Sequence, residues 1–304
     1  MKFSLQLPTD RVENLAEFGT AEAIAEIAKA TEEAGFDASF VTEHPFPTDE
    51  WLSSGGHHAL DPFVSLAVAA SATTNLLLHT NILVLAYRNP FLTAKAVASL
   101  DAISGGRVIV GVGAGYLEGE FAALGADFKN RNDVSDDALI AMQAAWTGES
   151  VSLSKPGFEA VGNTMLPAPI QKPHPPIWIG GNSPRAIRRS VDFAQGWSPF
   201  PLPAAGAGRT RTAAIETVED LAAGIVRMKE YAEKQGRSEP LDVNFVPFGL
   251  HMNTRKVPSD DALHEQFAAL EAAGVNWVTM GLPTRSRSEY LETLARFAET
   301  FLGR

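Results

Sequence analysis

The chain has 304 residues, a formal net charge of −11 and no cysteine. The acidic balance argues against nucleic acid and anionic membrane surfaces as partners, and the lack of cysteine excludes disulfides and metal–thiolate sites. No apolar run approaches the roughly 18 residues of a membrane span, and the first residues lack the apolar core of a signal peptide. We therefore expect a cytoplasmic protein.

Short apolar, β-branched segments alternate with segments of helical period along the whole chain. We expect strands at 3–7, 36–41, 76–85, 107–112, 177–179, 196–198, 241–250 and 275–280. We expect helices at 21–34, 62–74, 90–104, 116–124, 133–146, 184–194, 218–235, 260–273 and 289–301.

Strands that alternate with helices eight times indicate an α/β protein folded as a TIM (β/α)8 barrel; a doubly wound open sheet is the alternative. We expect a single domain over residues 1–304, with insertions near 148–176 and 199–213. The first insertion has room for a small hairpin, and the second, rich in Pro, Ala and Gly, is expected to be a mobile loop. In such a barrel the chemistry lies at the C-terminal ends of the strands.

The helix expected at 90–104 has clear ends. Asn89 is placed to cap it, Pro90 occupies its first turn, and a pair of glycines follows it. Its apolar residues at helical spacing are Leu92, Ala96, Leu100 and Ile103. We expect this face of the helix to be buried.

Glu43 and His44 follow directly after the strand expected at 36–41. An imidazole at that place points into the barrel mouth, where it can act as a general acid or base. The adjacent carboxylate can orient the ring or raise its pKa. We take His44 as the candidate acid or base, oriented by Glu43; the alternative is a loop histidine with no role.

Two glycine-rich turns follow expected strands. The segment 180–183, Gly-Gly-Asn-Ser, opens a helix, so its backbone N–H groups can approach a phosphate; a plain turn capped by Ser183 is the alternative. The segment 111–115, GVGAG, lacks the last glycine of a dinucleotide fingerprint, because Tyr116 stands there. We interpret it as a flat turn that leaves room for a planar ligand.

The remaining candidates for chemistry are histidines and tryptophans. His57 and His58 adjoin each other in a loop and lack the spacing of metal ligands, so we expect no metal site. The histidines that we interpret as structural are His79, His174, His251 and His264. Among the tryptophans, Trp51 and Trp197 are the two best placed to line a pocket.

Four blocks of the sequence carry a resemblance to a known family. They are VTEHPFP (41–47), HTNILVLAYRNP (79–90), LDAISGGRVIVGVGAGYLEGEF (100–121) and QKPHPPIWIGGNSPRAIRR (171–189). In these blocks the chain resembles the bacterial luciferase-like superfamily of flavin and deazaflavin enzymes, and it is most similar to the oxidoreductases that use coenzyme F-420. The resemblance implies a TIM barrel with insertions, in agreement with the strand count.

The resemblance also implies a cofactor that lies across the barrel mouth, with its phosphate at the turn after the fifth strand. The residues implied to bind it are Asn81, Ile82, Gly113, Ala114, Gly115, Tyr116, Gly180, Gly181, Asn182 and Ser183. A non-proline cis peptide bond is implied at Asn81–Ile82, behind the ring. The acidic residue and the histidine of the family correspond to Glu43 and His44.

The function implied by the resemblance is hydride transfer between coenzyme F-420 and a small organic substrate such as an alcohol, a ketone or an activated alkene. The alternative is an FMN-dependent luciferase-like monooxygenase that uses oxygen. A second alternative is a non-catalytic binder of a flavin or a phosphate ligand. Relatives are often dimers, and the apolar helix faces of this chain permit a homodimer.

Overall fold

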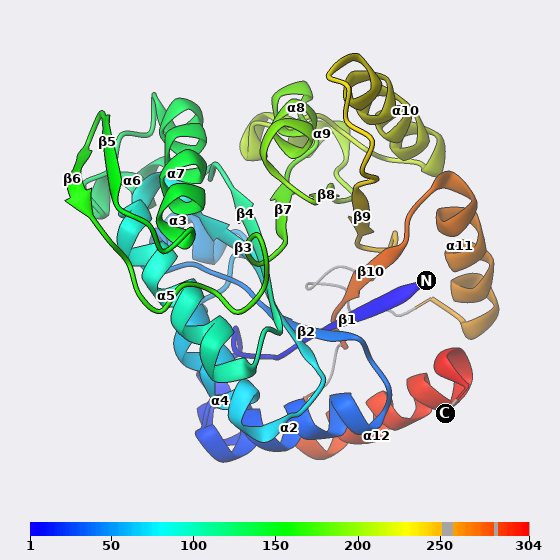
Figure 1. Ribbon diagram of the computed structural model, residues 1–304. Helices are drawn as coiled ribbons and strands as arrows, with labels where there is room; N and C mark the ends of the chain where they lie inside the picture. Colours follow the sequence, from blue (N-terminus) through cyan, green and yellow to red (C-terminus); the bar gives the residue numbers. More distant parts are fainter. Residues whose placement is uncertain (251–257, 283–284, 304) are drawn as a thin grey trace.

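A closed barrel of eight parallel strands forms the centre of the computed structural model, which describes residues 1–250, 258–282 and 285–303 (Figure 1). The barrel strands are β1 (Lys2–Gln6), β2 (Ala38–Val41), β3 (Leu77–Val84), β4 (Val108–Gly113), β7 (Ile177–Gly180), β8 (Gly196–Ser198), β9 (Asp242–Phe245) and β10 (Trp277–Met280). Strand β1 pairs with β2 on one side and with β10 on the other, which closes the barrel. The predicted TIM barrel is confirmed, and the open sheet is excluded.

Helices surround the barrel between its strands (Figure 1). They are α1 (Leu15–Phe18), α2 (Ala21–Glu33), α3 (Asp49–Ser53), α4 (Pro62–Ala72), α5 (Pro90–Ser104), α6 (Glu118–Ala123), α7 (Arg131–Trp146), α8 (Pro184–Phe193), α9 (Ala204–Thr210), α10 (Val218–Lys234), α11 (Asp260–Ala273) and α12 (Arg287–Phe297). Side-chain caps start several of them, as Asp61 does for α4 and Asn89 for α5. Among the described residues, none of the helices has the length and apolar character needed to cross a bilayer.

The buried face of α5 differs from the predicted one. Leu92 and Ile103 are 73% and 65% exposed, whereas Ala94 and Ala98 are fully buried. Small side chains on the inner face let the helix lie close to its neighbours, and Trp146 of α7 donates its indole N–H to the carbonyl oxygen of Ala94 at 3.0 Å. The predicted face is therefore wrong at Leu92 and Ile103, whereas Leu100 on the same face is buried.

The two predicted insertions differ in structure. The first contains the antiparallel hairpin of β5 (Val151–Lys155) and β6 (Phe158–Asn163), as expected. The end of this insertion is tied to the barrel by the buried Asp101, whose carboxylate accepts from the backbone N–H groups of Ile170 and Gln171. The second insertion was expected to be a loop, but it contains α9 and a bridge between Leu202 and Ile215.

Strand β9 is shorter than predicted. It ends at Phe245, just before Pro247, which we expected to mark the end of the predicted strand 241–250 or a bulge in it. Pro247 has no backbone N–H and interrupts a strand ladder. The chain therefore leaves the barrel before this proline, and residues 246–250 are free to line the mouth.

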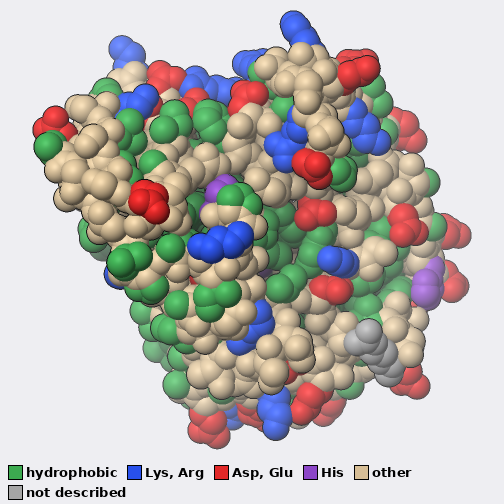
Figure 2. Space-filling view, viewed as in Figure 1, with side chains coloured by type: hydrophobic (Ala, Val, Ile, Leu, Met, Phe, Trp, Pro, Cys, Tyr) green, Lys and Arg blue, Asp and Glu red, His purple; other side chains and the backbone are tan. Residues whose placement is uncertain are grey.

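Apolar side chains also lie on the outside of the molecule. Figure 2 shows hydrophobic side chains gathered on the side of the molecule that carries α5, with acidic and basic side chains spread around the margin. Val64 of α4 is 67% exposed, like its neighbours Leu92 and Ile103 on α5. The homodimer that such faces permit stays a prediction.

Candidate functional site

The C-terminal ends of six barrel strands, β2, β3, β4, β7, β8 and β9, enclose a chamber of about 560 Å³, which we call the basic chamber. It is lined by Glu43 and His44 after β2, by Asn81 and Ile82 within β3, by 113–116 after β4, and by Gly180, Gly181 and Ser183 after β7. All the site residues predicted from the sequence line this chamber except Asn182. The four segments that carry the predicted residues are therefore brought to one place, as the barrel rule predicts.

The Asn81–Ile82 turn forms one wall of the basic chamber. This peptide bond is cis, as the resemblance implied, and the register between β3 and β4 shifts between Thr80 and Leu83. A Cβ atom on Gly113 would lie 2.4 Å from the Ile82 side chain, and one on Gly180 would lie 2.6 Å from it. A Cβ atom at either position would therefore require the end of the Ile82 side chain to shift.

Asn182 does not face the chamber. Its amide donates to the carbonyl oxygens of Phe200 and Ala213, and its side-chain oxygen accepts from the backbone N–H of Phe200. These bonds hold the second insertion against the turn after β7. The predicted direct role of Asn182 in cofactor binding is therefore corrected to a structural one. Ser183, in contrast, lines the chamber, and its hydroxyl oxygen caps α8 by accepting from Ala186 N–H at 3.1 Å.

Basic side chains surround the diglycine turn, and the sequence analysis missed them. The arginines that line the basic chamber are Arg131, Arg185, Arg189 and Arg211. Arg185 and Arg189 could have been found from the sequence, because a spacing of four residues after the turn puts both on one face of α8. Arg131 and Arg211 come from α7 and from the second insertion, so only the fold brings them here.

The arginines differ in how their charge is balanced. Arg185 and Arg189 both pair with Asp136, and Arg211 pairs with Glu118 at 3.1 Å. Arg131 makes no ion pair with any described residue: it donates to the carbonyl oxygens of Gly115 and Phe128 and lies 4.2 Å from the Phe128 ring centre. Its charge is therefore available to an anionic ligand in the chamber.

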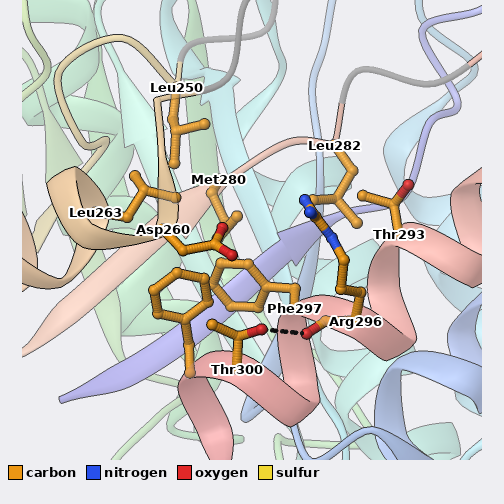
Figure 3. A pocket seen from close by; sticks show the side chains of 10 residues that line it. Leu250, Asp260, Leu263, Met280, Leu282, Thr293, Arg296, Phe297 and Thr300 are labelled. Carbon is orange, nitrogen blue, oxygen red and sulfur yellow. Dashed lines mark hydrogen bonds between the residues drawn. The ribbon is translucent and has the colours of Figure 1, made fainter.

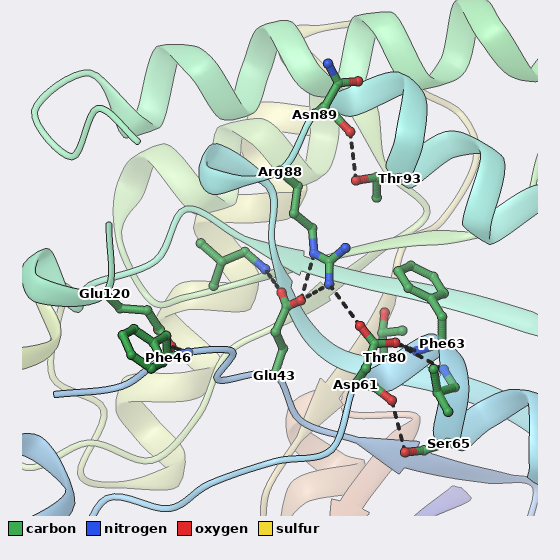
Figure 4. Close-up of polar contacts among 12 residues, drawn as sticks. Glu43, Phe46, Asp61, Phe63, Ser65, Thr80, Arg88, Asn89, Thr93 and Glu120 are labelled. Atoms are coloured by element: carbon green, nitrogen blue, oxygen red, sulfur yellow. Dashed lines mark hydrogen bonds and ion pairs between the residues drawn. The ribbon is translucent and has the colours of Figure 1, made fainter. Parts of the chain in front are cut away.

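Glu43 does not orient His44, which corrects the expectation drawn from their adjacency. Its carboxylate is directed toward Arg88, which donates through Nε at 2.7 Å and through Nη2, and it accepts from Val84 N–H at 2.8 Å (Figure 4). Burial raises the pKa of Glu43, and the Arg88 guanidinium opposes that rise. Successive side chains after a strand leave the backbone in different directions, so neighbours in sequence need not touch.

The partner of His44 is Glu120 of α6. Its Oε2 lies 3.3 Å from His44 Nδ1, and its Oε1 accepts from Phe46 N–H at 3.0 Å. Glu120 is buried and His44 is mostly so, with side-chain exposures of 2% and 11%. Because a carboxylate can only accept, we assign the ring proton of neutral His44 to Nδ1, which leaves Nε2 free.

Three aromatic rings surround His44. Trp51 lies 4.3 Å away between ring centres, His57 lies 5.0 Å away with its ring nearly perpendicular, and Tyr116 lies 6.4 Å away. Burial lowers the pKa of His57 to about 4 and raises the pKa of Tyr116 to about 12, so both are neutral at pH 7. The sequence analysis missed His57 as a site residue, although it correctly placed Trp51 at a pocket.

The structure also shows where the other tryptophan and histidine candidates lie. Trp197 is fully buried beside α10 and does not line the chamber, which corrects the prediction that it lines a pocket. Its indole N–H donates to the carbonyl oxygen of Gly181 at 2.8 Å. His79 lies fully buried inside the barrel against Trp178. His251 lies outside the described residues. No cluster of three potential metal ligands occurs in the described part of the chain.

A second chamber adjoins the first and has a volume of about 940 Å³. We call it the apolar chamber, since its walls are largely aromatic and aliphatic side chains from α3, the second insertion and the segment after β9. The two chambers share the lining residues His57, Asn81, Tyr116, Phe200, Thr210 and Val246. A ligand in one chamber can therefore touch a ligand in the other.

A family model described as luciferase-like monooxygenase matches residues 1–300. The chain belongs to this family. The resemblance seen in the sequence is thereby confirmed, and this luciferase-like protein is an oxidoreductase. The family also fits the geometry, because the chamber lies at the mouth of a barrel with a cis peptide bond in β3.

Individual relatives of this luciferase-like protein are distant. An F-420-dependent glucose-6-phosphate dehydrogenase from Beutenbergia cavernae is 34% identical over 55% of this chain and 48% of its own length. Among solved structures, an F-420-dependent secondary alcohol dehydrogenase with an F-420–acetone adduct has a TM-score of 0.75 at 15% identity, covering 99% of this chain and 98% of its own. The oxygenating part of 3,6-diketocamphane monooxygenase from Pseudomonas putida, in complex with FMN, has a TM-score of 0.73 at 16% identity, covering 98% and 97%. These two structural similarities show the fold alone.

Proposed function

We propose that this chain transfers a hydride between coenzyme F-420 and a small organic substrate. The observation that carries the proposal is the contact of His44 with Glu120 at the edge of the basic chamber. A buried carboxylate that holds one ring nitrogen leaves the other nitrogen to exchange a proton with a bound molecule. Hydride transfer to or from an alcohol or ketone needs such a proton exchange.

The residues of the basic chamber fit a cofactor with an anionic arm. Gly180 and Gly181 lead into the N-terminus of α8, where the helix dipole favours negative charge, and the arginines named above surround this turn. FMN ends at one phosphate, whereas coenzyme F-420 continues from a phosphodiester into a tail of several carboxylates. Arg131 and Arg211, which come from other segments and both lie over the Phe128 ring, support the longer anionic arm.

When bound, coenzyme F-420 supplies a ring carbon, C5, that accepts or donates a hydride. In the oxidation of an alcohol, the substrate would lose a hydride from its carbinol carbon to the bound cofactor and a proton from its hydroxyl, and a carbonyl group would remain. Neutral His44 takes that proton on Nε2. Glu120 holds the Nδ1 proton throughout and stabilises the imidazolium that forms. In the reverse direction His44 returns the proton to the carbonyl oxygen.

Two alternatives remain candidates. An FMN-dependent monooxygenase that uses oxygen is supported by the family model, which is described as luciferase-like monooxygenase. A non-catalytic binder of a flavin or a phosphate ligand would need the basic chamber but not the His44–Glu120 contact.

A binding titration tests the proposal. Purified protein is titrated with oxidised coenzyme F-420 and, in a separate experiment, with FMN, while the fluorescence of each ligand is followed. Tight binding of F-420 alone supports hydride transfer to or from a deazaflavin. Tight binding of FMN alone moves the protein to the monooxygenase alternative, and binding of neither overturns the proposed function.

A further inference from the structure

The apolar chamber adjoins the basic chamber, and the four arginines that line the basic chamber do not line it. Trp51 and His57, which both contact His44, belong to its wall, and Phe200 separates it from the basic chamber. Its far walls are Leu202 and Ile215 of the second insertion and Phe248 after β9. His44 itself lines the basic chamber, so a molecule in the apolar chamber reaches it only across the shared lining residues His57 and Tyr116, while its remainder is buried against hydrocarbon.

Few charged side chains line the apolar chamber. Among the described lining residues, the formally charged side chains are Arg209 and Glu216, and both are exposed at the outer edge. Glu216 already accepts from the backbone N–H of Ala204 at 3.2 Å. His57, deeper inside, donates Nδ1–H to the carbonyl oxygen of His58 at 2.8 Å and is neutral at pH 7. A charged substrate group in the interior of this chamber would be desolvated without a partner of opposite charge.

The inner end of the apolar chamber is closed. Leu250 and Met280 form this end, and they also border a separate cavity of only about 30 Å³ that reaches toward α11 and α12 (Figure 3). Phe297 and other side chains fill the space around that cavity (Figure 3). A void of this size holds about one water molecule and no larger ligand, so the substrate must fit on the His44 side of Met280.

We propose that the apolar chamber is the substrate site and that it selects an uncharged, predominantly hydrocarbon alcohol or ketone, and not a phosphorylated sugar or a carboxylate. This proposal rests on the proposed function, since it uses the same His44. On this proposal the basic chamber binds the anionic cofactor. The apolar chamber binds a neutral molecule whose single oxygen is directed toward His44. The volume of about 940 Å³ leaves room for a ring or a branched chain.

A matched pair of ligands tests the chamber. Protein is first loaded with coenzyme F-420, which is verified by quenching of the cofactor fluorescence. The loaded protein is then titrated by calorimetry with 4-tert-butylcyclohexanol and with 4-hydroxycyclohexanecarboxylate, which share the ring and the hydroxyl but differ in charge. Glucose 6-phosphate serves as a third ligand. We expect the uncharged alcohol to bind at least about tenfold more tightly than either anion, because an unpaired charge is costly to bury.

A pair of variants shows where the alcohol binds. Ala205→Phe fills the chamber from α9, whereas Ala204→Phe changes the neighbouring exposed residue, which does not line it. We expect Ala205→Phe to weaken binding of the alcohol at least about tenfold while the affinity for F-420 is unchanged, and Ala204→Phe to leave both affinities unchanged.

The outcomes separate the two proposals. Failure to load with F-420 overturns the proposed function. Normal loading followed by equal binding of the three ligands, by tighter binding of an anion, or by no binding of the alcohol overturns the assignment of the apolar chamber. Equal effects of the two alanine substitutions overturn it as well.

Discussion

His44 Nδ1 lies 3.3 Å from the carboxylate oxygen Oε2 of Glu120, a residue 76 positions further along the chain. The two side chains come from different βα units, and both are largely buried at the barrel mouth. This contact, and not the adjacent Glu43, sets which nitrogen of His44 faces a substrate. It is the basis of the first two predictions.

Substitution His44→Ala removes the proposed acid or base. We expect kcat to fall by about a hundredfold to ten-thousandfold, the usual contribution of general acid–base catalysis. The dissociation constant of F-420 should stay the same, since the arginines and the diglycine turn hold the anionic arm. Steady-state kinetics and the fluorescence titration measure both quantities, with the exposed His58→Ala as the control. Normal turnover by His44→Ala would show that another group moves the proton.

Substitution Glu120→Gln keeps the shape of the side chain but removes its charge. Glu120 acts through His44, so we expect kcat to fall by about tenfold or more, with KM and the F-420 affinity nearly unchanged. Glu120→Asp retains the charge and should recover part of the lost kcat, which a purely structural role would not predict. The exposed Glu50→Gln is the control. A fall in stability with unchanged kcat would contradict the positioning role.

Arg131 has no ion-pair partner among the described residues, so its charge is proposed to meet the cofactor. We expect Arg131→Gln to raise the dissociation constant of F-420 by about tenfold to a hundredfold, as loss of a hydrogen bond to a charged group does. The difference from the unmodified protein should shrink at high salt, because salt screens the lost attraction. The exposed Arg227→Gln of α10 should bind F-420 normally. Equal affinities of Arg131→Gln and the unmodified protein would remove Arg131 from the site.

The buried pair of Glu43 and Arg88 is expected to support stability. Substitution Glu43→Gln leaves the Arg88 guanidinium without its buried carboxylate, so the free energy of unfolding should fall by about 3 kcal/mol. Glu118→Gln makes the same substitution in the exposed pair with Arg211 and should cost at most about 1 kcal/mol. Urea unfolding of the two variants measures the difference, and similar midpoints would argue against a structural role for Glu43.

Acid should destabilise the protein as the pH falls below 6.5. Burial lowers the pKa of His57 to about 4 and that of His79 to about 3, from a usual value of 6.5. The unfolded chain therefore binds protons that the folded chain does not bind below pH 6.5, and the free energy of unfolding falls as the pH drops toward 4. Urea midpoints at pH 7 and pH 5 should differ less in His57→Gln than in the unmodified protein or in His58→Gln. Identical pH dependence in all three would contradict the burial of His57.

Part of the site was predictable because its signals are local. The strands and their turns follow from short apolar runs that end in glycine or proline, so the positions of Gly180 and Gly113 at strand ends could be found without a structure. Once strands alternate with helices eight times, the barrel rule places every strand end at one mouth. The chain order alone therefore placed His44, Asn81 and Ser183 beside one chamber.

The sequence could not decide which side chains touch. It suggested Glu43 as the partner of His44, yet the fold turns Glu43 toward Arg88 and brings Glu120 from α6 instead. It suggested a buried Leu92, yet the small residues of α5 face inward. Local pattern determined the strands and the turns, because backbone propensity and hydrophobic period act over a few residues, and the resemblance of four sequence blocks indicated the family. Tertiary structure decided the proton partner, the arginines around the diglycine turn and the apolar chamber, since these depend on distances between segments that are far apart in the chain.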